Sequence, residues 1–120
     1  MYKRQEDIYN NPKSIYVANR LGSPKINILN RASLNTSSPD KASQLGLRPE
    51  HIKIGEGELS GSIKTVESLG AETVVELDYN GVEILSLYQG AFQGQKGDNV
   101  NFAIDQNKIL FFDEKGMSVQ

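Results

Sequence analysis

The dipeptide Asn80-Gly81 is the feature that most constrains how this chain folds. Both residue types tolerate the positive φ angles of a two-residue type I′ turn, which makes this pair the strongest short signal for a β-hairpin. The runs on either side, ETVVELDY and VEILSLY, alternate in the way expected of strands with one buried face. The sequence therefore predicts an antiparallel hairpin centred on this turn.

A two-residue turn also fixes the register of that hairpin. The predicted pairs on its mostly apolar face are Tyr79 with Val82, Leu77 with Ile84, Val75 with Ser86 and Thr73 with Tyr88. On the opposite face Asp78 meets Glu83. Because like charges directly opposite each other repel, we expect that face to be exposed to solvent near the turn.

Shorter runs with strand character surround the hairpin. INIL, residues 26–29, predicts a brief strand, and NVNFAID (99–105) and KILFFD (108–113) predict two more. ELSGSIKTV (58–66) alternates, with one face made of Leu59, Gly61, Ile63 and Thr65. Five or six short antiparallel strands in about 70 residues predict an all-β fold, a small OB-like, partly closed antiparallel barrel.

The N-terminal third of the chain has a different pattern. Residues 5–21 predict two short helical segments separated at Pro12, since proline lacks the amide that a helix interior needs. The second segment is too short to be stable alone, and its apolar stripe consists of Ile15, Ala18 and Leu21. Residues 30–44 are polar and rich in Ser and Asn, and they predict a loop.

The composition excludes several kinds of site. The chain has no Cys, which excludes disulfides, thiolate catalysis and cysteine-based zinc sites. Residues 1–53 carry 9 Lys and Arg against 4 Asp and Glu, whereas residues 54–120 carry 4 against 11. The basic residues are scattered singly, which disfavours nucleic-acid binding. No apolar run approaches the roughly 20 residues of a membrane-spanning helix, and we expect a cytoplasmic protein.

No catalytic motif stands out in the sequence. The stretch GAFQGQKGD (90–98) lacks the glycine-lysine-serine/threonine order of a phosphate-binding loop. Glu72 and Glu76 belong to a predicted strand, where carboxylates are ordinarily solvated. His51 is the single histidine, and neither Cys nor a spaced carboxylate cluster completes a metal site around it. We therefore predict no catalytic residue, no metal site and no bound cofactor in these 120 residues.

Four stretches occur in an order that resembles a known family. They are EDIYNNPKSIYVANRLGSPKINIL, LGLRPEHI, GSIKTVESLGAETVVELDYNGVEI and a closing KILFFD. Together they resemble the C-terminal part of the ATP-binding subunit of bacterial ABC importers for sugars or glycerol phosphate, most strongly the maltose-importer type. In that family an OB-like regulatory domain, called TOBE, follows the nucleotide-binding domain.

The resemblance implies a division of the chain. Residues 1–25 would be a helical linker from a nucleotide-binding domain that we expect to precede them, and residues 26–120 the TOBE domain, with residues 30–44 as a polar loop. The family usually has further strands between the GSPKIN and LGLRPEH motifs, so we expect this barrel to be abbreviated or completed by another chain. The implied structural or regulatory residues are Arg48, Pro49, Glu50, His51, Gly70, Ala71 and Glu72.

The resemblance also implies a role and partners. The domain would be regulatory and dimer-stabilising, without catalysis of its own, and ATP and Mg would bind only in the nucleotide-binding domain. Its partners would be a second copy of the ATPase subunit, permease subunits reached through the nucleotide-binding domain, and a regulatory protein. The complex would lie at the inner face of the cell membrane. We expect substitution of His51 to affect folding or regulation more than catalysis.

Two other functions remain open on the sequence. A related kind of barrel binds small oxyanions such as molybdate, and Ser60, Ser62 and Lys64 form a polar strand face that could do so. An oligonucleotide-binding OB domain would need aromatic and basic residues interleaved on one sheet face. Mostly acidic and neutral residues surround the candidate aromatic side chains, Tyr79, Tyr88, Phe102, Phe111 and Phe112, which disfavours nucleic acid as a partner.

Overall fold

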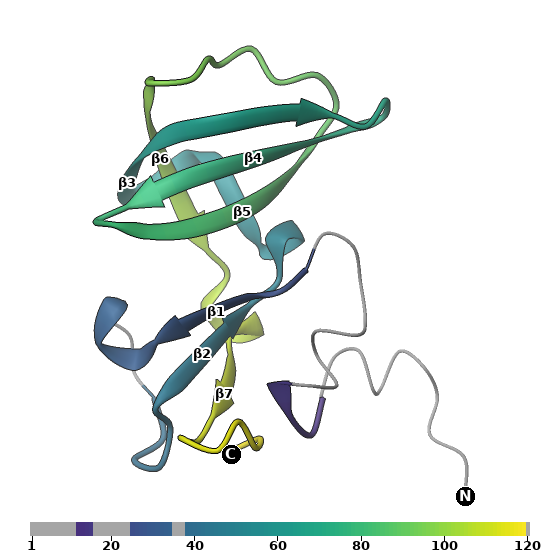
Figure 1. Cartoon of the computed structure of the whole chain (residues 1–120). Coiled ribbons are helices and arrows are strands. Elements are labelled where there is room, and N and C mark those ends of the chain that lie inside the picture. The colour runs from purple at the N-terminus through teal and green to yellow at the C-terminus, as the bar shows by residue number, and fades with distance from the viewer. Residues whose placement is uncertain (1–11, 16–24, 35–37, 120) are drawn as a thin grey trace, which may run out of the picture.

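The computed structural model describes residues 12–15, 25–34 and 38–119. Within them the chain forms seven strands and three short 3₁₀ turns (Figure 1). The strands are β1 (Asn27–Asn30), β2 (Gln44–Leu47), β3 (Ile52–Ser68), β4 (Glu72–Tyr79), β5 (Val82–Gln89), β6 (Asn99–Ile104) and β7 (Leu110–Phe112), and the turns are η1 (Arg31–Ser33), η2 (Pro49–His51) and η3 (Gln106–Lys108). The predicted all-β, OB-like fold is confirmed.

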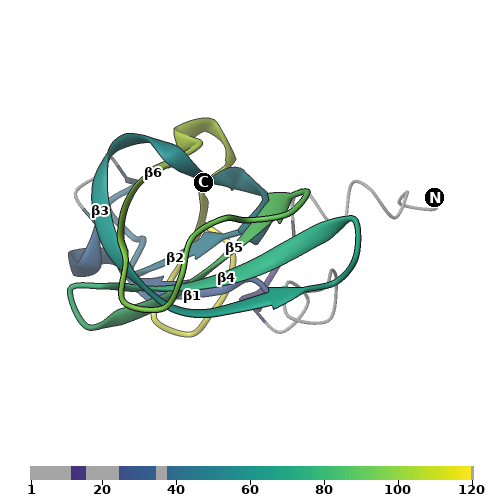
Figure 2. The ribbon, with the colours of Figure 1, turned by 90° about the horizontal axis from the view of Figure 1, so that it is seen from above.

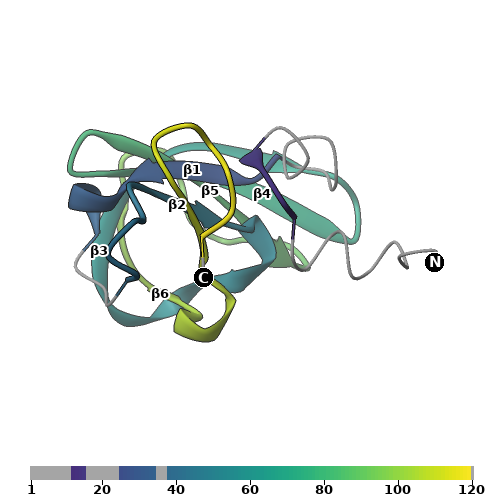
Figure 3. The same cartoon turned by 90° about the horizontal axis from the view of Figure 1, so that it is seen from below.

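The strands form two antiparallel sheets. One has the order β1-β2-β7 and the other β5-β4-β3-β6, and Figure 1 shows the four-stranded sheet above the three-stranded one. Seen from above, β3 and β6 curve round one side while β4 and β5 lie opposite (Figure 2). Seen from below, β1, β2 and the C-terminal turn lie across the lower end (Figure 3). In the described residues no strand ladder joins the two sheets, so the barrel is not closed.

The central hairpin has the predicted register. The structure pairs Tyr79 with Val82, Leu77 with Ile84, Val75 with Ser86 and Thr73 with Tyr88, as well as Asp78 with Glu83. Asn80 has φ 52° and Gly81 φ 87°, the positive angles that a type I′ turn requires. The turn residues therefore determine which side chains of β4 and β5 face the core.

Strand β3 is longer than any predicted strand because it serves two neighbours. Its first part pairs with β6 and its last part with β4. Ile54 and Leu59 both pair with Phe102, so residues 55–58 bulge out of register. Gly57 has φ +91°, and a Cβ there would lie 2.6 Å from the carbonyl oxygen of Phe102. Only glycine fits that approach, and such a bulge bends the strand.

A second irregularity in β3 corrects the predicted alternation. The register shifts between Ile63, which pairs with Leu77, and Thr65, which pairs with Glu76. One inserted residue exchanges the two faces of a strand. Thr65 therefore lies on the outer face, where its Oγ1 is 3.5 Å from the Glu76 carboxylate. The alternation predicted it on the same face as Ile63.

The core fills the space between the sheets. Its fully buried members include Leu45 of β2, Val75 and Leu77 of β4, Ile84 of β5 and Phe102 of β6. The region predicted as a polar loop, residues 30–44, also contributes, since Leu34 and Ala42 are buried. The predicted helical segments in 5–21 lie outside the described residues except for 12–15, and so do Ala18 and Leu21 of the apolar stripe.

Candidate functional site

The motif GLRPEH carries the chain from one sheet to the other. Pro49 restricts the residue before it to extended backbone, and Arg48 has φ −70° and ψ 136° as predicted. Pro49 then starts η2, in which the His51 N–H donates to the Arg48 carbonyl at 2.9 Å. β3 begins at the next residue, Ile52, so the motif is the connection between β2 and β3.

Burial and hydrogen bonds to Ser86 and Asp105 hold this connection in place. Arg48 is only 2% exposed, and Pro49 is fully buried. The Ser86 hydroxyl of β5 donates to the Ile52 carbonyl at 2.8 Å, and the Asp105 N–H donates to the His51 carbonyl at 3.1 Å. His51 thus holds the chain through its backbone. Among the described residues its buried ring Nδ1 has no hydrogen-bond partner.

Gly46, in the same motif, is required by packing. A Cβ at this position would lie 2.8 Å from Cε2 of Phe112 and 3.0 Å from Cδ1 of Ile26. Real Cβ atoms do not approach carbon that closely without displacing a neighbour. Gly46 therefore lets β2 pack against the small apolar cluster around Phe112 and Ile26.

Asn27 of β1 is a structural residue that the sequence pattern does not reveal. Its Nδ2 donates to the Leu47 carbonyl at 3.0 Å and to the Leu85 carbonyl at 2.9 Å, and its Oδ1 accepts the Leu85 N–H at 2.7 Å. The side chain is 7% exposed. It therefore ties the three-stranded sheet to the edge of β5. Its only sequence signal is its place in the GSPKIN motif.

The other predicted motif residues lie at a projecting turn between β3 and β4, which we call the hairpin tip (residues 66–72). The Leu69 N–H donates to the Glu72 carbonyl at 2.7 Å, and the Gly90 N–H donates to the Ala71 carbonyl at 2.8 Å. Gly70 supplies the positive φ of +96°. Figure 1 shows this turn at the end of the four-stranded sheet, away from η2. The structure therefore places the two groups of predicted residues apart.

The hairpin tip presents apolar side chains to solvent. Leu69 is 55% exposed and Val66 39% exposed. Single exposed apolar residues are common, but these two flank one short turn that backbone hydrogen bonds hold in shape. They form a small apolar protrusion on a fixed frame.

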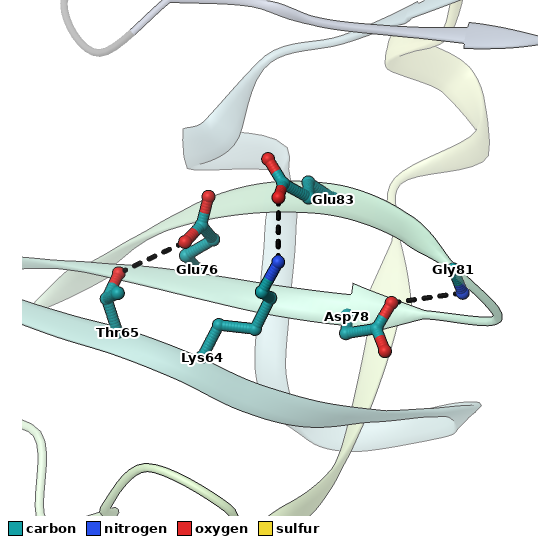
Figure 4. A network of polar contacts seen from close by, with 6 residues as sticks. All are labelled: Lys64, Thr65, Glu76, Asp78, Gly81 and Glu83. Atoms are coloured by element: carbon teal, nitrogen blue, oxygen red, sulfur yellow. Dashed lines mark hydrogen bonds and ion pairs between the residues drawn. The ribbon is translucent and has the colours of Figure 1, made fainter.

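The polar face predicted around Lys64 is electrostatically unsuited to an anion. Lys64 Nζ lies 2.7 Å from Glu83 Oε1, with Glu76 and Asp78 on the same face (Figure 4). The hydrogen bond and charge of Glu83 raise the pKa of Lys64, and Lys64 in turn lowers the pKa of Glu83. Lys64 is thus neutralised by carboxylates, while the Asp78 carboxylate turns to the hairpin turn, where its Oδ1 accepts the Gly81 N–H at 3.0 Å.

The aromatic residues serve mainly as core. Phe102 and Phe112 are fully buried, and Tyr79 meets Phe102 edge to face, with ring centroids 5.5 Å apart. Tyr88 meets Phe92 in the same manner at 5.1 Å. They do not form the exposed stacking platform that single-stranded nucleic acid requires.

Two features are absent from residues 12–15, 25–34 and 38–119. No group of three or more His, Asp or Glu side chains among them could hold a metal ion. No helix within them has the length and apolar character needed to cross a membrane.

Comparison with known proteins identifies the family. Residues 45–112 match the TOBE domain. The sn-glycerol-3-phosphate import ATP-binding protein UgpC of Psychromonas ingrahamii is 33% identical over 131 residues, covering 89% of this chain and 35% of that protein. The alpha-glucoside transport ATP-binding protein AglK of Rhizobium meliloti is 26% identical over 139 residues, covering 93% of this chain and 38% of that protein. The chain thus spans a little more than a third of the length of these two relatives. It belongs to the TOBE domain family, and its relatives are ATP-binding proteins of sugar and glycerol-phosphate transport.

Proposed function

We propose that this chain is the regulatory and dimer-stabilising domain of the ATP-binding subunit of a bacterial ABC importer for sugars, glycerol phosphate or related solutes. The observation that carries the proposal is the TOBE match over residues 45–112, combined with relatives that cover nine-tenths of the chain. The chain itself would perform no catalysis. ATP and Mg would bind in the nucleotide-binding domain of the same subunit.

The proposed partners follow from that architecture. A second copy of the subunit would face this domain, the permease would be reached through the nucleotide-binding domain, and a regulatory protein would bind the TOBE domain. The complex would be cytoplasmic and peripheral at the inner face of the cell membrane. A contact that forms in only one arrangement of the two subunits shifts their equilibrium toward that arrangement.

The hairpin tip is the contact that we propose for such regulation. Leu69 is the most exposed of the large apolar side chains in the described residues, and the hydrogen bonds of Leu69 and Gly90 fix its position. A rigid apolar protrusion loses little conformational entropy on binding. Arg48–His51, by contrast, lies at the junction of the sheets, where it would maintain the frame that carries the tip.

An oxyanion-binding role has less support. It needs a positive or hydrogen-bond-donating pocket, whereas Lys64 is bound to Glu83 and faces Glu76 and Asp78. Ser60 is exposed on the same strand, and Ser62 is half-buried. No observation on this face favours an anion over a solvated strand surface.

The complete subunit purified with its permease in lipid vesicles provides the test. We expect Leu69→Asp to change ATP turnover or its response to the regulator by several-fold, because a charge at the tip opposes burial. Lys108→Asp, on exposed η3, should leave both unchanged. The 120-residue chain alone should hydrolyse no ATP. Turnover by that chain, or a complete protein that never copurifies with a permease, would refute the proposal.

A further inference from the structure

After β7 the chain turns back on itself. The Asp113 carboxylate Oδ1 accepts the N–H groups of Lys115 and Met117, both at 2.9 Å. Gly116 takes a φ of +83°, and its N–H donates to the Asp113 carbonyl at 2.9 Å. The Val119 N–H then donates to the Phe111 carbonyl of β7 at 2.9 Å. We call this segment, residues 113–119, the C-terminal return.

The outer side of the C-terminal return pairs with the N-terminal segment 12–15. The Ile15 N–H donates to the Gly116 carbonyl at 2.8 Å, and the Ser118 N–H donates to the Lys13 carbonyl at 2.7 Å. Between these bonds Ser14 and Met117 form an antiparallel bridge. The return therefore lies between β7 and residues 12–15, and its short pairings extend the three-stranded sheet.

Side chains strengthen this pairing. Ile15 packs on the apolar cluster around Phe112 and Ile26, and its Cδ1 would lie 3.6 Å from a Cβ at Gly116. Pro12 is buried as well. Backbone hydrogen bonds and the side chains of Pro12 and Ile15 thus hold the segment on the domain, a small contact that can open at a lower free energy than the core.

We propose that the C-terminal return is a clasp that fixes residues 12–15 to the three-stranded sheet. The functional consequence rests on the proposed function, in which residues 1–25 link this domain to a nucleotide-binding domain. While residues 12–15 are paired with the C-terminal return, a movement of the linker would be transmitted to the TOBE domain. When that pairing is broken, the linker and the domain would move independently. Residues 113–119 would then control the coupling without contacting nucleotide.

Amide hydrogen exchange on the 120-residue chain tests the clasp independently of any transporter. Truncation after Lys115 removes the Gly116 carbonyl and the Ser118 N–H together. We expect the Ile15 amide to exchange at least about tenfold faster, while the amides of the central strand β4 keep their protection. Unchanged exchange at Ile15 would overturn the proposal, and so would an equal loss of protection throughout β4.

A matched pair of variants separates the clasp from a general loss of stability. Ser118→Pro removes the N–H that binds the Lys13 carbonyl, whereas Ser118→Ala keeps it. The proline variant should speed exchange at Ile15, and the alanine variant should not. Equal exchange rates at Ile15 in the two variants would contradict the proposal. In the complete subunit the proline variant should also weaken regulation of ATP turnover. Normal regulation combined with faster exchange at Ile15 would refute only the functional consequence.

Discussion

The side chain of Asn27 makes with the backbone of Leu85 the pair of hydrogen bonds that a neighbouring strand would make. It accepts the Leu85 N–H at 2.7 Å and donates to the Leu85 carbonyl at 2.9 Å. No strand ladder connects the two sheets within the described residues. One carboxamide therefore satisfies the edge of β5 at this position and holds β1 against it.

Asn27→Ala should destabilise the domain by about 2 kcal/mol, because it leaves the N–H and carbonyl of Leu85 without their partner in a partly buried place. Urea unfolding followed by circular dichroism would measure this. Asn101→Ala, on the exposed face of β6, is the control and should change stability by less than about 0.5 kcal/mol. Equal effects of the two substitutions would show that Asn27 does not join the sheets.

Gly46→Ala should cost about 1–3 kcal/mol through overpacking against Phe112. The steric cause predicts coupling: in a Phe112→Leu background, where the atom 2.8 Å away is gone, the same substitution should cost less. Gly70→Ala tests backbone conformation alone, since Gly70 has φ +96° and no atom within 4 Å of a Cβ. Its cost should be the same in both backgrounds. If Gly46→Ala costs the same stability in the wild type and in the Phe112→Leu background, the contact with Phe112 is not the cause.

The Lys64–Glu83 pair gives a prediction about pH. The pKa of Glu83 is lowered in the folded protein, so its contribution to stability is present above the unfolded pKa and is lost as pH falls through the folded pKa. The pKa of Lys64 is raised, so its contribution is present below the unfolded pKa of 10.5 and is lost as pH rises through the folded pKa.

Carbon-detected NMR titration of the Glu83 carboxyl would test this pair. Lys64→Met should raise the pKa of Glu83, because it removes the hydrogen bond and the positive charge that lower that pKa. Added salt should shrink the difference between the variant and the wild type, since both side chains are exposed. Lys108→Met is the control. A titration of Glu83 that is the same in the Lys64 variant as in the wild type would mean that the ion pair does not persist in solution.

Calorimetry can decide between the regulatory role and an oxyanion site. Molybdate, tungstate and sulfate should each give no saturable heat with this chain, because carboxylates already neutralise Lys64. Binding in the micromolar range that disappears in Lys64→Met would instead establish the oxyanion function.

The central hairpin was predictable because local chemistry determines it. Asn80-Gly81 allows one kind of turn, and a two-residue turn leaves one register, so the pairs from Thr73 to Tyr88 follow from the sequence alone. The extended backbone at Arg48 was predictable for a similar reason, since Pro49 acts directly on its neighbour.

Features that depend on distant contacts were not predictable. The predicted alternation of β3 assumes that every residue of the strand pairs with one on its neighbour. The bulge at Lys64 instead moves Thr65 to the other face. The bulge at residues 55–58 depends on how closely Gly57 approaches β6. Asn27 acts on Leu85, 58 residues further along the chain. The role of such a residue becomes visible only when the sheets are placed together.

The size of the native polypeptide tests the central claim most directly. An antibody raised against this domain can recover the protein from its source cell, and intact mass spectrometry can then weigh it. A TOBE domain of an importer ATPase predicts a polypeptide about three times as heavy as this 13.3 kDa chain, as its relatives are. A native protein of 13.3 kDa would contradict the account and would require a freestanding regulator.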